Sequence, residues 1–184
     1  MIFEKLSIDG PLIIKPTRIK DKRGYFQESL RLDKLESFLG YKIVFCQEND
    51  SFSKKNVFRG LHYQISPFDQ VKLVKVVRGK ILDVIVDLRK ESPTFGKHLK
   101  ISLSDSNNKQ LFVPSGFAHG FLTKSNKTIV SYKVNNFYSF DHDRSLNILD
   151  PKLNIKLNIS NAHISKKDKN APFLDELNLM NNDI

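Results

Sequence analysis

Between residues 71 and 134 the chain repeats one pattern, in which short segments rich in apolar and β-branched residues are separated by Gly, Pro, Asn and Asp. Segments of this kind, bounded by turn-forming residues, are typical of β-strands. The expected strands cover residues 71–77, 81–88, 100–103, 110–113, 117–123 and 127–134. Many short strands and few helices predict a mainly β fold, an antiparallel sandwich or barrel. We expect a small β-barrel that holds a ligand in its mouth.

The first two expected strands are joined by Arg78-Gly79-Lys80, a turn sequence that predicts a β-hairpin. In the second strand, aliphatic residues at every other position alternate with Asp83 and Asp87. Successive side chains of a strand point to opposite faces of its sheet. The pattern therefore predicts one buried face and one solvent-exposed face.

The N-terminal part of the chain is expected to contain a strand over residues 12–17 and a turn over residues 21–24. A helix is predicted over residues 33–39, where leucines recur on one face. Asp33 is the expected N-terminal cap, and Gly40 is expected to end the helix.

The 184 residues contain no internal repeat, low-complexity linker or break in composition. A chain of this length fits one domain that buries a core of ordinary size. We expect this domain to span residues 1–177. The polar, Asn-rich segment 178–184 is expected to be a flexible C-terminal tail.

The formal net charge is +10, which favours an anionic partner: a nucleic acid, an acidic membrane face or a phosphorylated small molecule. The Lys and Arg residues are scattered, and the chain has no zinc-finger spacing, RNP-like aromatic motif or basic helix. Nucleic acid is therefore disfavoured as the partner. Most of these charges are expected to lie on a solvated surface.

Cysteine content and hydropathy indicate in which cellular compartment the protein is expected. The single cysteine, Cys46, has no second cysteine with which to form an internal disulfide, which favours a reducing cytosol. We expect Cys46 to be a small buried hydrophobic residue. The chain start lacks the apolar segment of a signal peptide, and no apolar run approaches the length of a membrane span. We expect a cytoplasmic protein without a membrane partner.

Two polar side chains share a strand face with apolar neighbours. Tyr132 shares its face with Val130 and Val134, and Lys72 shares its face with valines of its own strand. Both side chains should therefore point inward. Tyr132 could be a core tyrosine whose hydroxyl is bonded to the backbone. Lys72 could be an edge residue whose ammonium reaches solvent. If the ammonium of Lys72 is buried instead, it needs an anionic partner or a chemical role.

His62 lies in a strand-like segment, and His119 lies in an extended segment flanked by glycines. A lone histidine on a strand is more often structural than catalytic. Histidine-lined barrels can hold a metal, but Gln64 stands where a second close ligand would be expected, and no nearby Glu completes a ligand set. We therefore expect no metal. The absence of Gly-x-Ser-x-Gly, Walker and Gly-x-Gly-x-x-Gly motifs also disfavours a dinucleotide cofactor.

Several six- to eight-residue blocks and shorter motifs follow one another in a specific order. They are Arg59-Gly-Leu-His-Tyr-Gln, Gln70-Val-Lys-Leu-Val, Val86-Asp-Leu-Arg, Ser92-Pro-Thr-Phe-Gly and Pro114-Ser-Gly-Phe-Ala-His-Gly-Phe. With these blocks the chain closely resembles the dTDP-4-dehydrorhamnose 3,5-epimerases over about residues 15–172. The resemblance implies a cofactor-independent cupin, a jelly-roll barrel with a few short helices that dimerises by exchanging N-terminal strands. It also implies a nucleotide-diphosphate sugar substrate and a place in dTDP-rhamnose and polysaccharide biosynthesis.

The resemblance implies four catalytic residues. His62 matches the family's base, and Asp168 of the motif Ser165-Lys-Lys-Asp matches the aspartate that pairs with it. Tyr132 matches the acid on the opposite face of the sugar, and Lys72 matches the lysine that steadies the oxygen at C4.

The resemblance also implies a set of substrate-binding residues. Arg59, Lys167 and Arg23 match positions that hold the diphosphate, with Arg23 reaching across the dimer. The other implied binding residues are Phe26, Glu28, Gln47, Asn49, His119, Tyr138 and Asp143.

Three positions depart from the family pattern: Asp143 replaces the usual glutamate, Leu157 stands where a tryptophan is common, and Phe140 stands where a proline is usual. They leave the substrate open. The expected reaction converts dTDP-4-dehydro-6-deoxy-D-glucose into dTDP-4-dehydro-L-rhamnose. The alternatives are an epimerase, of both carbons or of one, for another nucleotide-linked 4-keto sugar such as a GDP-linked 6-deoxy-heptose; a related 3,4-ketoisomerase; and a sugar-nucleotide-binding cupin without activity.

Overall fold

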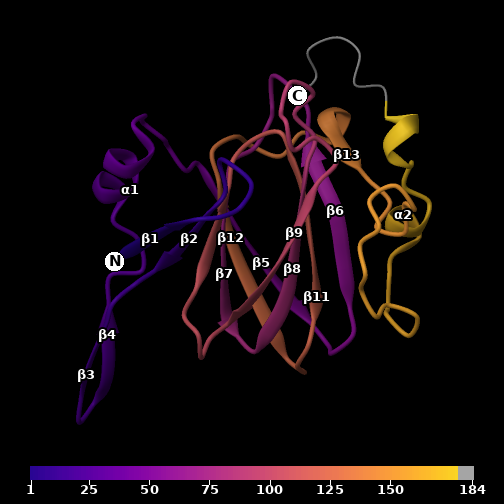
Figure 1. The fold of residues 1–184 in the computed structure, drawn as a ribbon. Coiled ribbons are helices and arrows are strands. Elements are labelled where there is room, and N and C mark those ends of the chain that lie inside the picture. The colour runs from indigo at the N-terminus through magenta and orange to yellow at the C-terminus, as the bar shows by residue number, and fades with distance from the viewer. Residues whose placement is uncertain (178–184) are drawn as a thin grey trace.

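Two antiparallel β-sheets lie face to face in the computed structural model, which describes residues 1–177 (Figure 1). The strands of the first sheet are β1 (Ile2–Lys5), β2 (Leu12–Lys15), β5 (Gln47–Ser53), β7 (Lys72–Arg78), β10 (Gln110–Val113) and β12 (Thr128–Val134). The strands of the second sheet are β6 (Phe58–Gln64), β8 (Lys80–Asp87), β9 (His98–Ser104), β11 (Phe117–Thr123) and β13 (Asp143–Ser145). The predicted tail, residues 178–184, lies outside the described residues.

The order of the strands is β1-β2-β10-β7-β12-β5 in the first sheet and β13-β6-β11-β8-β9 in the second. Neighbouring strands far apart in sequence are the mark of a jelly roll. The predicted mainly β jelly-roll fold is confirmed, with two sheets that do not close into a continuous barrel. A separate ribbon of β3 (Arg18–Asp21) and β4 (Gly24–Gln27) projects away from both sheets (Figure 1).

The short helices lie outside the sheets. They are α1 (Leu32–Leu39), η1 (Phe140–His142), α2 (Lys166–Lys169) and η2 (Leu174–Glu176). The predicted end of α1 is confirmed, because Gly40 adopts φ 80° and donates its N–H to the Glu36 carbonyl. The predicted cap is wrong: the N-cap is Arg31, and Asp33 lies in the first turn, where its carboxylate binds the Arg31 guanidinium at 2.6 Å. Within residues 1–177, no helix has the length and apolar character that crossing a bilayer requires.

The predicted hairpin at Gly79 is wrong. β7 pairs with β10 and β12, whereas β8 pairs with β11 and β9, so the turn carries the chain from one sheet to the other. Gly79 adopts φ 88°, and its N–H donates to the Asp105 carboxylate at 2.7 Å. A local turn sequence specifies a tight reversal, but only long-range pairing decides which sheet receives each strand.

β8 is buried on both faces, which also corrects the prediction of a solvent-exposed face. Asp83 and Asp87 have no exposed surface. One face of β8 packs Ile85 into the core between the sheets, and the other packs Val84 and Val86 against the C-terminal segment. That segment covers the outer face of the five-stranded sheet (Figure 1). Cys46, expected to be buried, is exposed beside the edge strand β5.

An irregularity in β6 alters which side chains share a face. His62 pairs with His119, and Arg59 pairs with Phe121. Between these two pairs β6 advances by three residues and β11 by only two, so β6 contains one extra residue. Strict alternation would put Arg59 and His62 on opposite faces of the sheet. The extra residue in β6 brings both side chains to the same cavity.

Two glycines make this irregularity possible. A Cβ placed on Gly60 would lie 2.5 Å from the Gly120 Cα and 2.7 Å from the His119 carbonyl oxygen, and Gly60 has φ 121°. We expect Gly60→Ala to destabilise the protein by about 3 kcal/mol, through the clash and the unfavourable backbone conformation. Thermal unfolding followed by circular dichroism measures the effect.

The matched control is Gly40→Ala. Gly40 also has positive φ, but no atom lies within 4 Å of the position that a Cβ would take there, so its replacement should cost only about 1 kcal/mol. Equal losses of stability in the two variants would contradict the close approach of β6 and β11 as the cause.

Candidate active site

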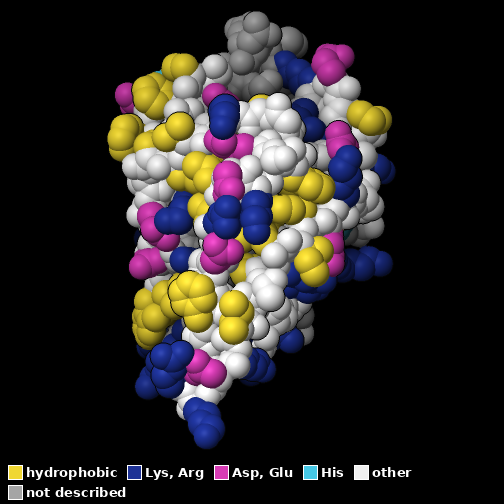
Figure 2. Space-filling model, turned by 90° about the vertical axis from the view of Figure 1, so that its left-hand side faces the viewer, with side chains coloured by type: hydrophobic (Ala, Val, Ile, Leu, Met, Phe, Trp, Pro, Cys, Tyr) yellow, Lys and Arg dark blue, Asp and Glu magenta, His cyan; other side chains and the backbone are white. Residues whose placement is uncertain are grey.

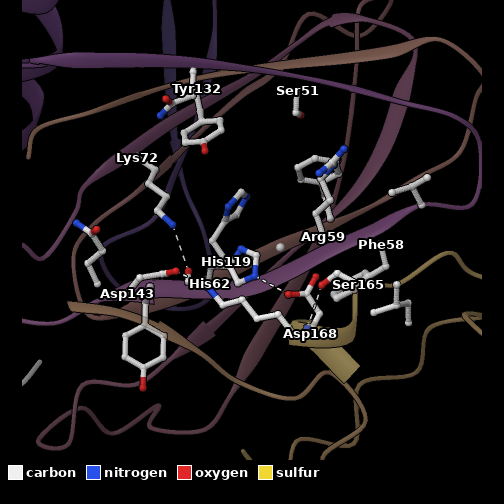
Figure 3. A pocket seen from close by; sticks show the side chains of 18 of the residues that line it. Ser51, Phe58, Arg59, His62, Lys72, His119, Tyr132, Asp143, Ser165 and Asp168 are labelled. Carbon is white, nitrogen blue, oxygen red and sulfur yellow. Dashed lines mark hydrogen bonds and ion pairs between the residues drawn. The ribbon is translucent and has the colours of Figure 1, made fainter. Parts of the chain in front are cut away.

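A cavity of about 900 Å³ opens between the sheets and is bounded on one side by the C-terminal segment (Figure 3). Its volume lies in the range usual for small-molecule sites. The predicted site residues that line it are Gln47, Asn49, Arg59, His62, Lys72, His119, Tyr132, Tyr138, Asp143, Lys167 and Asp168. They come from both sheets, from the loop after β12 and from α2.

Three predicted site residues lie elsewhere. Arg23 sits in the turn of the β3–β4 ribbon, Phe26 lies on β4 and Glu28 follows it. None of them lines the cavity among residues 1–177. The Arg23 guanidinium binds Asp21 instead, and the Arg23 side chain is 90% exposed.

His62 and Asp168 are hydrogen-bonded to each other in the cavity (Figure 3). His62 Nε2 lies 2.7 Å from Asp168 Oδ1, and Asp168 is buried. Burial would raise the pKa of the Asp168 carboxyl, but hydrogen bonds from His62, the Gly60 N–H and Ser165 outweigh it and lower the pKa. An ionised carboxylate only accepts, so Nε2 carries the proton. The lone pair of His62 is then on Nδ1, which has no hydrogen-bond partner within the described chain.

The position of Asp168 depends on how α2 is anchored. Ser165 caps this helix by accepting the Asp168 N–H at 3.0 Å. Asn147 donates its side-chain amide to the carbonyls of Lys169 and Ala171, both at 3.1 Å. These contacts hold a residue more than a hundred positions from His62 against the imidazole.

Lys72 projects from the first residue of β7 into the cavity, as the alternation of its strand predicted (Figure 3). It is 7% exposed, and its ammonium donates to the His62 carbonyl at 3.2 Å. Burial lowers the pKa of Lys72 to about 8, while the charges of Asp143 and Asp83 act in the opposite direction. The ammonium is therefore a buried cation with no direct ion pair in the described chain.

Tyr132 also points into the cavity, as predicted. It comes from β12 in the six-stranded sheet, whereas His62 comes from β6 in the five-stranded sheet, so the two side chains reach the cavity from opposite walls (Figure 3). Burial raises the pKa of the Tyr132 phenol. The positive charge of Arg59 lowers this pKa, and the negative charge of Asp143 raises it. The phenol keeps its proton at neutral pH.

Cations and an aromatic ring line the rim of the cavity. The Arg59 guanidinium is held by two uncharged acceptors, Ser53 Oγ at 3.0 Å and the Phe52 carbonyl at 3.3 Å, so its charge is available to an anion. Asp143 Oδ2 binds the Lys167 ammonium, and it accepts a hydrogen bond from the Tyr138 hydroxyl at 3.2 Å. The site thus offers a base, a proton donor, a buried cation and a cationic rim.

The residue that sequence reasoning missed is Asp83, which binds His119 behind the cavity wall at 2.9 Å. Simple alternation along β8 assigns its acidic side chain to a solvent-exposed face. The signal that could have found it is the neighbouring pair Ile81 and Ile85, which share its strand face and are fully buried.

Comparison with known proteins identifies close relatives. A sequence model of the dTDP-4-dehydrorhamnose 3,5-epimerases matches residues 5–176. The dTDP-4-dehydrorhamnose 3,5-epimerase of Shigella flexneri is 45% identical over 167 residues, which are 91% of this chain and 92% of that protein. The enzyme of the same name from Salmonella typhimurium is 44% identical over 177 residues, 96% of this chain and 97% of that protein.

A solved structure has the same fold. The dTDP-6-deoxy-D-glucose-3,5-epimerase of Legionella pneumophila, crystallised in complex with dTDP-4-keto-L-rhamnose, superposes with a TM-score of 0.91 at 40% identity. The superposition covers 96% of this chain and 94% of that chain.

Proposed function

The chain belongs to the dTDP-4-dehydrorhamnose 3,5-epimerase family, and we propose that it is an isomerase that inverts C3 and C5 of dTDP-4-dehydro-6-deoxy-D-glucose to give dTDP-4-dehydro-L-rhamnose. The relatives carry this activity in their names, and one of them was crystallised with the product-like keto sugar. We propose that one domain over residues 1–177 performs the reaction.

The observation that supports this proposal best is that a base and an acid face one cavity from opposite walls. C3 and C5 both flank the C4 ketone, so loss of a proton from either carbon leaves an enolate whose charge collects on O4. His62 Nδ1 takes that proton, and Asp168 stabilises the resulting imidazolium.

Inversion follows when the proton returns from the other side. Tyr132 donates its hydroxyl proton to the opposite face of the same carbon, the enolate electrons re-form the ketone, and the carbon has the opposite configuration. The imidazolium then loses its proton to water and the phenolate regains one. Each carbon keeps its oxidation state, so these proton transfers balance without an electron donor or acceptor.

Lys72 stabilises the negative charge that forms in the reaction, and the cations at the rim of the cavity bind the substrate. The buried Lys72 ammonium is the group that stabilises the negative O4, which lowers the barrier for both carbons. Arg59 suits the diphosphate because its guanidinium bonds two oxygens at once. Lys167 is a second cation at this rim, and the Tyr138 ring offers a stacking surface for the base. The net charge of +10 would attract such an anion.

The test of this function is proton exchange with solvent. The protein and dTDP-4-dehydro-6-deoxy-D-glucose are mixed in heavy water, and the sugar is analysed by NMR. We expect deuterium at both C3 and C5 of a product with the inverted configuration. Label at one carbon alone would reduce the activity to a mono-epimerase, a moved carbonyl would indicate a ketoisomerase, and label at neither carbon would overturn the proposal.

The other candidates are less well supported. A GDP-linked heptose as substrate has no counterpart in the relatives' names, which specify dTDP sugars. A binding protein without activity would not need His62, Asp168, Tyr132 and Lys72 to converge on one cavity. Comparing the affinities for dTDP, UDP and GDP by calorimetry tests the nucleotide, and tighter binding of GDP would contradict our assignment.

We also propose that two chains form a dimer through the β3–β4 ribbon, so that Arg23, Phe26 and Glu28 complete the site of the partner. On the ribbon, Ile19 is 65% exposed and Phe26 is 67% exposed. Figure 2 shows hydrophobic side chains gathered on the lower part of the face that carries the N-terminal elements. Apolar side chains on a projecting ribbon favour a protein partner.

This dimer can be tested by mixing two inactive variants, His62→Ala and Arg23→Ala. A mixed dimer with exchanged ribbons contains one site in which both residues are intact. We expect activity to reappear after the two chains are mixed and allowed to exchange. A monomer in sedimentation analysis, or a mixture that stays inactive, would contradict the proposal.

A further inference from the structure

Asp83 is a buried acid that the proposed reaction does not use. Its carboxylate has no exposed surface, and Oδ2 lies 2.9 Å from His119 Nε2. Its other oxygen, Oδ1, is buried without a hydrogen-bond partner among the described residues. Burying a carboxylate oxygen without a partner is costly, so such a group calls for an explanation.

A candidate partner for Asp83 is Lys72, which comes from the opposite sheet. Asp83 shares a face of β8 with Ile81 and Ile85, which belong to the core between the sheets. Lys72 projects into the same space from β7 of the opposite sheet, and its ammonium donates only to a neutral carbonyl, that of His62. A buried carboxyl group and a buried amine thus occupy the same interior, and no direct ion pair joins them in the described residues.

The charges of the two groups influence each other. Burial raises the pKa of Asp83, and the nearby His119 and Lys72 offset part of this rise, which favours the carboxylate. Burial lowers the pKa of Lys72 to about 8, and Asp143 and then Asp83 act in the opposite direction. Electrostatic coupling is reciprocal, so each group favours the charged form of the other.

The other groups that face the Lys72 ammonium each have a hydrogen-bond partner of their own or are neutral, although the charge of Asp143 also acts on Lys72. From β6 comes His62, which is paired with Asp168. From β13 comes Asp143, whose carboxylate binds Lys167 and Tyr138. The remaining facing groups are His119 on β11, which is bound to Asp83, and the neutral phenol of Tyr132 on β12. Asp83 Oδ1 is the buried carboxylate oxygen that has no hydrogen-bond partner in residues 1–177.

We propose that Asp83 is a positioning residue whose carboxylate, held in place by His119, supplies a fixed negative charge that, together with Asp143, keeps the Lys72 ammonium protonated inside the cavity. The inference rests on the proposed function, in which Lys72 stabilises the charge on O4. It assigns His119 the task of orienting Asp83, in addition to lining the cavity.

The expected pH dependence follows from the direction of the coupling. The Lys72 ammonium is present below its pKa of about 8 and is lost as the pH rises through that value. Activity that needs this cation should therefore fall on the alkaline side. Removing the negative charge of Asp83 makes deprotonation of Lys72 easier, so the fall should begin at a lower pH.

The test is Asp83→Asn, which keeps the size of the side chain and removes its charge. In the pH profile of kcat/KM, we expect the fall on the alkaline side, called the alkaline limb, to occur at a pH about one unit lower. The activity at mildly acidic pH should stay near that of the unmodified protein. Asp83→Glu, which restores the charge, should move the limb back. If the asparagine variant does not fold by circular dichroism, Asp83→Ser replaces it, because its hydroxyl can still accept from His119.

The matched control is Asp87→Asn on the same strand. Asp87 is equally buried, but it binds Arg89, Ser92 and Thr94 and lies outside the cavity. Its replacement should lower stability and leave the alkaline limb in place. An unmoved limb in folded Asp83→Asn, a shift of the acidic limb instead, or an equal shift in the control would overturn the inference.

A second measurement separates this inference from the proposed function. The Lys72 amine can be titrated directly by NMR of ¹⁵N-labelled lysine, with its signal assigned by the loss of that signal in Lys72→Arg. We expect the pKa of Lys72 to be lower in Asp83→Asn than in the unmodified protein. An unchanged Lys72 titration would refute the role of Asp83 even if the protein is an active epimerase, whereas a lowered pKa in a protein without exchange activity would refute the function alone.

Discussion

Replacing His62 by alanine is expected to lower kcat by roughly 10³- to 10⁴-fold, because the variant lacks the group that we propose as the acceptor of the proton from C3 and C5. Asp168 cannot substitute for it, since its carboxylate lies behind the imidazole and has a lowered pKa, which makes it a weak base. Exchange of solvent deuterium into the substrate should be lost together with product. Both are measured in one heavy-water experiment by NMR.

The control for this variant is His98→Ala. His98 is a partly buried histidine on β9 and lies outside the cavity. Its replacement should leave both exchange and product formation near their normal rates. If His62→Ala retained full exchange, the proton would have to leave by another route, and the assignment of the base would fail.

Tyr132→Phe is expected to separate exchange from inversion. The variant keeps the ring in the cavity wall and loses the proton donor on the side opposite His62. His62 can still remove a proton, exchange it with solvent and return deuterium to the same face of the carbon. We therefore expect labelled substrate with unchanged configuration, and product formation lowered by roughly 10²- to 10³-fold.

The comparison that decides this prediction is the ratio of exchange to product in each variant. The ratio should rise strongly in Tyr132→Phe and stay normal in Tyr41→Phe, an exposed tyrosine outside the cavity. Equal loss of exchange and product in Tyr132→Phe would mean that the phenol is needed before proton removal. Undiminished inversion would mean that another group or water supplies the second proton.

The strand pattern was sufficient to predict the fold class. Alternating apolar residues and frequent turn residues are local properties, and they predicted β10 and β11 with the bounds that the structure has. The same local rule placed Tyr132 and Lys72 inside, because each sits on a strand face with valines that the core buries. Local periodicity is informative wherever the sheet is regular.

Predictions failed where a contact between distant parts of the chain overrides the local rule. The turn at Gly79 joins two sheets, since β7 finds its partners in β10 and β12 and β8 finds its own in β11 and β9. Asp83 is buried because the C-terminal segment and the opposite sheet enclose both faces of β8. Arg59 and His62 share the cavity because β6 contains an extra residue opposite β11.

The strand pattern alone indicated a mainly β chain with an inward tyrosine and an inward lysine, and the ordered blocks indicated the family. The strand pattern left His62 open between a structural and a catalytic role, because nothing in that pattern supplies an imidazole with a partner, and only the resemblance implied that His62 is the base. The tertiary structure adds the geometry that such a role needs: Asp168 lies 2.7 Å from His62 across more than a hundred residues, and Tyr132 lies on the opposite wall. Strand periodicity depends on neighbours along the chain, whereas a proton-transfer site depends on distances across the fold.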